Sequence, residues 1–159
     1  MAIKTQRTQL YFVDPSDGTV LAVDCPTGVS GIETTNDQIE TTCLDQDTKT
    51  FESGLSTPGS ASININFDPR LDTHVKLMQL KTAGETLQFA VGFSDGYGVA
   101  PTAVLNSEAD YELVLPTTRS WLEFEGYINS YSFDFSANDV VKATIGVQVS
   151  GEVALYPKV

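Results

Sequence analysis

The segment "VVKATIGVQVSGEVALYP", from Val140 to Pro157, alternates between apolar and polar residues over almost its whole length. Successive side chains of an extended strand point to opposite faces, whereas a helix would scatter this pattern around its axis. The pattern therefore predicts a long strand with one buried face. That face carries Val141, Ala143, Ile145, Val147, Val149, Val153 and Leu155, with Gly151 in register.

Other segments have the same period or a composition typical of strands. The expected strands are a hairpin around the turn Asp14–Gly18, one or two strands in Ile32–Leu44, and Ser60–Phe67, Thr86–Phe93, Tyr111–Pro116 and Trp121–Phe135. In the last of these the apolar positions change phase partway, so we expect a bulge at or near Gly126. Loops are expected at Asp24–Gly31 and Ser94–Asp110.

One helix is expected, at Pro69–Ala83, with Asp68 as its N-cap and Gly84 just past its end. Its apolar stripe consists of Leu71, Val75 and Met78. Leu77 and Leu80 lie outside that stripe. Apolar residues on more than one side of a helix indicate cover on more than one side. The second cover is either another chain or the body of the same domain.

A polar and acidic segment, Asp45–Gly59, lies between two of the expected strands and is rich in Ser, Thr, Gly and Asp. A connection of that length inside a compact domain is uncommon and is usually functional or disordered. Phe51 and Leu55 are its only large apolar residues. We therefore expect a long loop with two apolar anchors.

The chain has 159 residues, of which 41% are hydrophobic, which is enough for one domain with a core. The order of the elements predicts a mainly β fold: a β-sandwich or rolled sheet with one α-helix packed against it, forming a single domain over residues 1–159.

Acidic residues dominate the charge, since nine Lys and Arg oppose 21 Asp and Glu for a net charge of −12. Such a chain lacks the cations that neutralise DNA phosphates, and an anionic membrane is an equally poor partner. The charge either keeps a soluble protein apart from its neighbours or has a function of its own. The N-terminus lacks the apolar run of a signal peptide, and no segment is apolar enough to span a membrane, so we expect folding in a cytoplasm.

Residues with catalytic or metal-binding chemistry are few. His74 is the single histidine, and no G-x-S-x-G segment supplies a serine for a triad, so we expect a structural role for it. Cys25 and Cys43 form neither a CxxC motif nor a cluster with histidine, which gives no support for zinc. Glu123 and Glu125 share one side of a strand, and we interpret them as its solvated face rather than as an acid–base pair. We expect no enzymatic activity, no cofactor and no metal.

The order of these segments resembles that of the major tail tube proteins of long non-contractile, lambda-like phages. The resemblance rests on "DQIETTCLDQDTKTFESGLSTPGSASININFDP", "LDTHVKLMQLKTAGETLQFAVGF" and "FEGYINSYSFDFSANDVVKATIGVQVSGEV", which cover most of residues 30–155. In the last segment an aromatic-rich strand, a turn with Asn and Asp, and an alternating strand ending at Gly follow a habit of that family. The stretch Ser94–Ser120 is longer than expected for the family, and we expect no additional C-terminal immunoglobulin-like domain.

The resemblance implies a structural virion protein whose hexameric rings stack into a tail tube, the conduit for genome ejection. Sheets of neighbouring subunits would join into one inner β-barrel, which removes exposed strand edges. The implied partners are the tape measure, tail terminator and tail tip proteins, with DNA passing without specific binding and no membrane contact. Assembly would occur in the host cytoplasm. The alternative is a monomeric ligand-binding module, of carbohydrate-binding or adhesin type, that presents Tyr97, Tyr111, Trp121, Tyr127 and Tyr131 on one face.

Three sets of residues receive roles in the tail tube interpretation. The contact with the next ring is expected to involve Asp45, Asp47, Lys49, Phe51 and Leu55. Leu77 and Leu80 are expected to meet a neighbouring subunit. Glu40, Glu123 and Glu125 are expected to face the lumen, where carboxylates repel the DNA backbone within a Debye length of about 8 Å.

Overall fold

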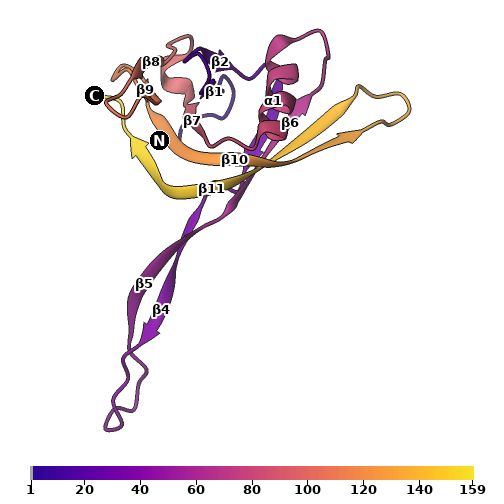
Figure 1. Ribbon diagram of the computed structural model, residues 1–159. Helices are drawn as coiled ribbons and strands as arrows, with labels where there is room; N and C mark the ends of the chain where they lie inside the picture. The colour runs from indigo at the N-terminus through magenta and orange to yellow at the C-terminus, as the bar shows by residue number, and fades with distance from the viewer. Residues whose placement is uncertain (1) are drawn as a thin grey trace.

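The computed structural model describes residues 2–159, which form a mainly β fold with one α-helix (Figure 1). The elements are β1 (Gln9–Val13), β2 (Val20–Ala22), β3 (Pro26–Ser30), β4 (Thr34–Glu40), β5 (Phe51–Pro58), β6 (Ser60–Asn66), α1 (Asp72–Ala83), β7 (Leu87–Gly92), the 3-10 turn η1 (Ser94–Gly96), β8 (Thr102–Leu105), β9 (Tyr111–Val114), β10 (Trp121–Asp134) and β11 (Lys142–Tyr156). Seven strands make one antiparallel sheet in the order β2-β1-β7-β10-β11-β6-β3, while β4–β5 and β8–β9 are separate pairs. The predicted fold class is confirmed.

The seven-stranded sheet rolls so that one face encloses the main core. The long strands β10 and β11 form a curved floor, β1 and β7 lie above it, and α1 closes one side (Figure 1). The fully buried side chains of this core include Phe12, Ile63, Ile65, Leu77, Phe89, Phe124 and Ile145. A smaller core on the outer face of the sheet, around Tyr11 and Trp121, is covered by the β8–β9 hairpin through Leu113.

A bulge in β10 explains the phase change seen in its sequence. Ile128 pairs with Val147 and Ser130 pairs with Gly146, so Asn129 is an extra residue. The insertion moves the inward-facing positions from Ile128 to Tyr131, and the predicted bulge is confirmed at Asn129 rather than at Gly126. Gly146 makes room for it, because a Cβ there would lie 2.2 Å from the Ser130 Oγ.

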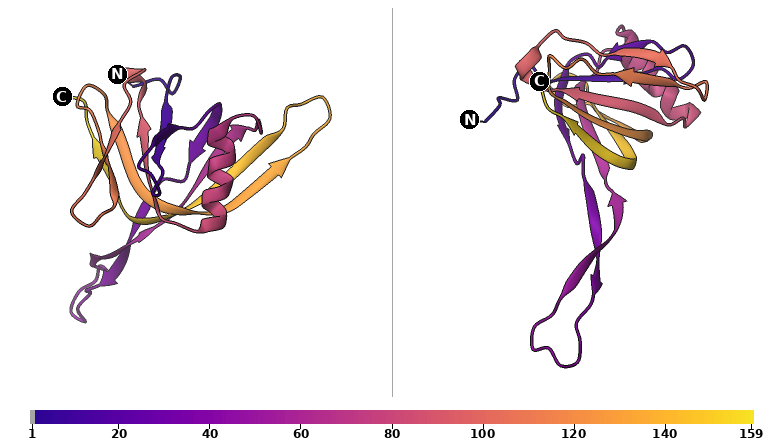
Figure 2. Two further views of the ribbon diagram at one scale, coloured as in Figure 1. Left: turned by 45° about the horizontal axis from the view of Figure 1, so that its top comes forward. Right: turned by 90° about the vertical axis from the view of Figure 1, so that its left-hand side faces the viewer.

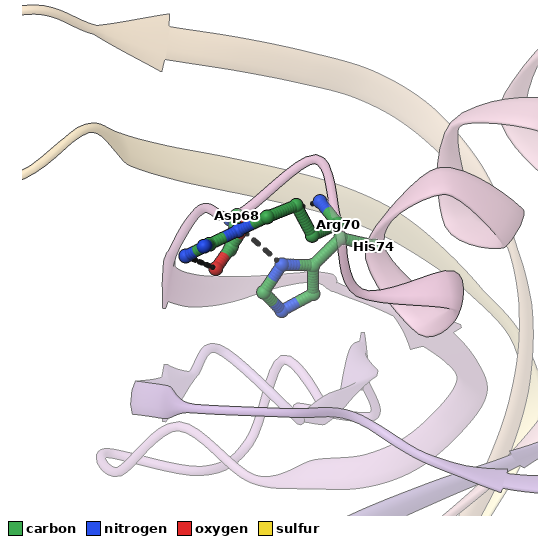
Figure 3. A network of polar contacts seen from close by, with 3 residues as sticks. All are labelled: Asp68, Arg70 and His74. Atoms are coloured by element: carbon green, nitrogen blue, oxygen red, sulfur yellow. Dashed lines mark hydrogen bonds and ion pairs between the residues drawn. The ribbon is translucent and has the colours of Figure 1, made fainter.

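The helix begins at Asp72 rather than at Pro69, because Asp68 does not cap it. The Asp68 carboxylate accepts hydrogen bonds from the backbone N–H and the guanidinium of Arg70, and these bonds lower the pKa of Asp68 to about 2 (Figure 3). The segment from Asp68 to Arg70 is therefore a turn that precedes the helix. The predicted end is confirmed: Gly84 has φ +70° and its N–H donates to the Leu80 carbonyl.

His74 fixes the rotation of α1 about its axis. Its ring is fully buried and stacks on Phe67, and its Nδ1 accepts a hydrogen bond of 3.1 Å from the Asp68 backbone N–H (Figure 3). Its Nε2 therefore carries the proton and donates to the Asp24 carbonyl at 2.7 Å. Both ring nitrogens are thus occupied by the backbone, which is a structural role.

As a result α1 buries the side opposite to the predicted stripe. Leu77 and Leu80 lie in the core of their own subunit, whereas Val75 and Met78 are 39% and 38% exposed. The expectation that Leu77 and Leu80 meet a neighbouring subunit is therefore wrong. Periodicity could not choose between two apolar sides, and the polar anchors of His74 decided the choice.

Three segments predicted as loops contain strands. β3 lies within Asp24–Gly31, β8 lies within Ser94–Asp110, and β5 occupies most of Asp45–Gly59. These strands lack a clean alternation of buried and exposed residues, so the sequence pattern did not reveal them. Each is defined by backbone pairing to β6, β9 and β4, respectively.

Arg119 joins the two ends of the chain to the sheet. Its side chain is fully buried, lies over the Trp121 ring and donates five hydrogen bonds. The acceptors are the carbonyls of Arg7, Gly92, Phe93 and Val99 and the amide oxygen of Gln9. Close by, the N–H of Val159 donates to the carbonyl of Thr117. Both termini therefore lie at the same end of the molecule (Figure 2).

Candidate assembly surfaces

The most exposed part of the molecule is a two-stranded ribbon, residues 34–58, that projects away from the body (Figure 2). We call it the arm. Strand β4 continues from β3 after a short break at residues 31–33, and β5 leads into β6 through Gly59. Every residue of β4 is exposed, and so are most residues of β5. A two-stranded hairpin alone is at best marginally stable, so this ribbon indicates a binding partner.

The arm exposes four large apolar side chains. Leu44 is fully exposed at the tip, and Leu55 is 83% exposed on β5. Phe51 lies across from Glu40 and Ile39 lies across from Glu52, so the two apolar residues stand on opposite faces of the ribbon. Phe51 and Leu55 are the two anchors expected from the sequence, whereas Ile39 and Leu44 were not expected because their segment was interpreted as strand.

The tip of the arm, residues 41–50, is closed by its own hydrogen bonds. The Thr41 N–H donates to the Thr50 carbonyl, and the Cys43 N–H donates to the Gln46 side chain. Asp45, Asp47 and Lys49 are exposed there, and none of them forms an ion pair within residues 2–159. The tip is therefore a compact, acidic surface.

A second surface is the outer face of β10, β11, β6 and β3, on which no other element of residues 2–159 packs in the floor region (Figure 1). Hydroxyl and amide side chains cover most of it: Ser60, Ser62, Asn64, Asn66, Asn129, Ser130, Ser132, Thr144 and Gln148. The register partners Asp134 and Lys142 share this face at its end. Some of these side chains form hydrogen bonds between neighbouring strands: the Thr144 hydroxyl of β11 donates to Asn64 Oδ1 of β6 at 3.1 Å. We call this surface the polar face.

The three carboxylates expected in a lumen do not gather on one surface. Glu125 is exposed beside the polar face, but Glu40 lies on the arm. Glu123 is half-buried near the β8–β9 hairpin, where it accepts a hydrogen bond from Gln88, whose own oxygen accepts one from the Leu113 N–H. Burial raises the pKa of Glu123.

The sheet also has open edges. β7 pairs only with residues 121–126 of β10, so residues 127–134 are bonded to β11 alone. At the other side of the sheet β3 pairs only with β6. Tyr131, Phe133 and Phe135 form an aromatic row along the projecting end of β10, and Phe135 is 76% exposed. Unpaired edges of this kind are templates for another strand.

Within residues 2–159 no three His, Cys, Asp or Glu side chains are grouped closely enough to hold a metal ion. No helix in that range has the length and apolar character needed to cross a membrane.

The model of the lambda-like phage tail tube family, "Phage tail tube, TTP, lambda-like", matches residues 1–159. The chain belongs to this family. A curated relative, "Structural protein 3" of Pseudomonas phage PAJU2, is 51% identical over 156 residues, which cover 98% of this chain and 94% of the relative. The chain is accordingly a structural protein of the phage tail.

Solved structures share the fold. The SPP1 tail tube protein superimposes with a TM-score of 0.71 at 12% identity, over 99% of this chain and 81% of that one. The tail subunit of an empty GTA particle with C6 symmetry gives a TM-score of 0.67 at 15% identity, over 96% and 98% of the two chains. Tail tube proteins thus keep this rolled sheet at low sequence identity.

The alternative of an aromatic ligand-binding face is not supported in this tail tube protein. Trp121 is fully buried in the smaller core. Tyr131 faces the main core and donates a hydrogen bond to the His74 carbonyl, while Tyr127 stands on the outer face of the sheet. The aromatic side chains therefore do not share one surface.

Proposed function

We propose that this tail tube protein assembles into six-subunit rings that stack into a tube, and that the genome passes through its bore during ejection. The family membership and the C6 symmetry named for the GTA tail support the ring. The observation that carries the proposal is the combination of two open sheet edges with a bare polar face between them.

The edges are suited to closing a ring. The strands β10, β11, β6 and β3 alternate in direction, so a neighbour's β10 placed beside β3 would again be antiparallel. Repeating this around a ring gives a closed barrel without free edges. The aromatic row of Tyr131, Phe133 and Phe135 lies along the same edge and would be covered by the neighbour.

The polar face would then line the bore. Its hydroxyl and amide groups bind water, and its lysine, Lys142, is in an ion pair with Asp139, so little positive charge is free to hold the phosphates of a moving DNA chain. Of the three carboxylates considered, Glu125 alone stands open beside this face, and it would add a ring of negative charge. We do not extend this role to Glu40 or Glu123.

The arm would reach the next ring. The expected contact residues are all exposed in the subunit, so they are free to meet another ring: Asp45, Asp47 and Lys49 at the tip, and Phe51 and Leu55 on β5. Proteins of similar fold include a sheath/tube terminator and a tube terminating cap of injection systems. We propose that this protein likewise meets tape measure, terminator and tip proteins after folding in the host cytoplasm. We assign the protein no catalytic role.

Electron microscopy of the purified protein tests the proposal. We expect rings or tubes from the parent protein and only folded monomers from a variant with residues 41–50 replaced by a short Gly-containing turn. The control variant shortens the β8–β9 turn at residues 106–109 and should still form tubes. Normal tubes from the arm-shortened variant would refute the role of the arm, and a parent protein that stays monomeric under all conditions would refute the assembly.

A further inference from the structure

The arm carries a strong negative charge. Asp37, Glu40, Asp45, Asp47 and Glu52 stand against Lys49, for a net charge of −4 within residues 34–58. All of these residues are exposed. In a chain with a net charge of −12, most surfaces of another copy would repel such a ribbon. The position of the free cations therefore restricts where the arm can dock.

Few of the nine cations are free to receive it. Arg70, Lys76 and Lys142 are in ion pairs, Arg119 is buried, and Lys49 is on the arm itself. The others are Lys4, Arg7, Lys81 and Lys158. Three of these four belong to segments that meet at η1, Lys4 and Arg7 near the N-terminus and Lys158 near the C-terminus.

The turn η1 gathers them. Ser94 donates a hydrogen bond to the Lys4 carbonyl at 2.7 Å, and the Lys158 Nζ donates to the Asp95 carbonyl at 3.0 Å. The guanidinium of Arg7 lies over the exposed ring of Tyr97, 5.4 Å from its centroid. We call Lys4, Arg7 and Lys158 the terminal cation cluster.

Asp95 is the carboxylate of η1 itself. Asp95 accepts hydrogen bonds from the hydroxyl and N–H of Ser120, and these bonds, with the charge of Lys158, lower its pKa. Glu112, Glu123 and the C-terminal carboxylate of Val159 lie at the adjoining cleft. The attraction for the arm therefore rests on the individual cations Lys4, Arg7 and Lys158, none of which is in an ion pair with a side chain of residues 2–159, and not on a net positive charge of the whole site.

An apolar cleft lies beside the cluster. It has a volume of about 430 Å³, within the range of pockets that bind ligands. Leu115, Pro116, Trp121 and Tyr156 line it, together with Glu112 and Glu123, and it reaches Pro157 and Val159 on either side of Lys158. A docking site here therefore combines an apolar cleft with a rim that carries both cations and carboxylates.

The tip of the arm has the complementary chemistry. Leu44 is fully exposed, and Asp45 and Asp47 follow it directly in the sequence. In one subunit the tip and the cluster lie far apart, since the arm projects away from the end that holds the termini (Figure 2). A contact between them therefore has to join two copies.

We propose that the arm of one subunit docks on the terminal cation cluster of another subunit, with Leu44 in the cleft and Asp45 and Asp47 on Lys4, Arg7 and Lys158. The inference rests on the proposed role of the arm and names its receiving surface. The contact is head-to-tail, because the two surfaces differ, so it propagates along a tube instead of ending in a dimer.

Charge reversal tests the pairing in the full chain. Asp45→Lys with Asp47→Lys, or Lys4→Glu with Lys158→Glu, should each raise the protein concentration needed for tube formation by about tenfold or more, and the four changes together should restore it to within about threefold. The matched control, Glu108→Lys with Asp110→Lys, changes the net charge of the chain by the same amount as the arm pair. It should leave assembly unchanged, and so should Lys81→Glu.

Crosslinking tests the position. In a Cys25→Ser, Cys43→Ser background, a bismaleimide should join Asp45→Cys to Lys158→Cys in tubes and give a ladder of covalent oligomers. The control pair, Asp45→Cys with Lys81→Cys, should not be joined. Absence of the ladder in well-formed tubes, or no rescue by the fourfold reversal, would overturn this inference while leaving the arm's general role to the shortening experiment.

Discussion

Replacing Arg119 should destabilise the subunit far more than replacing any exposed arginine. In Arg119→Ala, the backbone carbonyls of Arg7, Gly92, Phe93 and Val99 each lose a donor at once, whereas the Gln9 oxygen keeps those from Tyr11 and Gly98. A buried carbonyl without a donor costs about 1–3 kcal/mol, so even two that water cannot reach give about 2–6 kcal/mol. That is a large part of the 5–15 kcal/mol that typically holds a domain together.

Gly92 provides an independent test of the same geometry. A Cβ at this position would lie 2.5 Å from the Arg119 Cζ, and the guanidinium cannot move aside without breaking its hydrogen bonds. Gly92→Ala should therefore be strongly destabilising in the parent and much less so in the Arg119→Ala background, where the space is empty. This non-additivity is the signature of direct contact.

Urea unfolding of the monomeric, arm-shortened protein measures these free energies without interference from assembly. Arg70→Ala is the matched control: its side chain is 87% exposed in a surface ion pair, and it should change the free energy of unfolding by less than about 1 kcal/mol. Additive effects of Gly92→Ala and Arg119→Ala, or a loss below about 1 kcal/mol for Arg119→Ala, would refute the reasoning.

Three further predictions concern the core, the pH dependence and the bulge. Leu77→Ala should cost about 2–5 kcal/mol in urea unfolding, whereas Met78→Ala should cost less than about 1 kcal/mol; equal costs would contradict the observed face of α1. Because the folded pKa of Glu123 is raised, the folded state holds its proton more tightly, and stability should fall as pH rises from about 4.5 toward neutrality. Glu123→Gln should remove that fall and raise the melting temperature at pH 7 but not at pH 4; an unchanged pH profile would show that the burial is unimportant. Gly146→Ala should lower the melting temperature through the clash with Ser130, and Ser130→Gly should relieve it in the double variant.

The sequence was informative wherever one face of a strand is buried. The alternation in β6 and in residues 143–149 of β11 predicted which side chains enter the core, since a strand between a core and a solvated face must have a period of two. It did not predict the shift of register after Ser150, beyond which Leu155 is exposed. The bulge in β10 was also visible, because it shifts the phase of an otherwise regular pattern. These are local rules, and they hold without knowledge of the rest of the fold.

The arm and the helix face depended on information that is not local. β5 is exposed on both sides, so no alternation marks it, and only its pairing with β4 makes it a strand. On α1 the decision between two apolar sides came from His74, whose partners Asp24 and Asp68 lie outside the helix. Arg119 gave no sequence signal, because its acceptors are backbone carbonyls, which every residue has.

Because the arm is attached outside the sheet that carries the polar face, the width of the tube and the spacing of its rings depend on different parts of the chain. β10, β11, β6 and β3 carry the polar face, whereas the arm begins beyond Gly31 and Gly59, after those strands have ended. If tubes form as proposed, the diameter of the bore follows from the number of strands in each ring, and the spacing of successive rings follows from the length of the arm. Changes in arm length could then alter how many subunits a tail of given length needs, while the width available to the DNA stays the same.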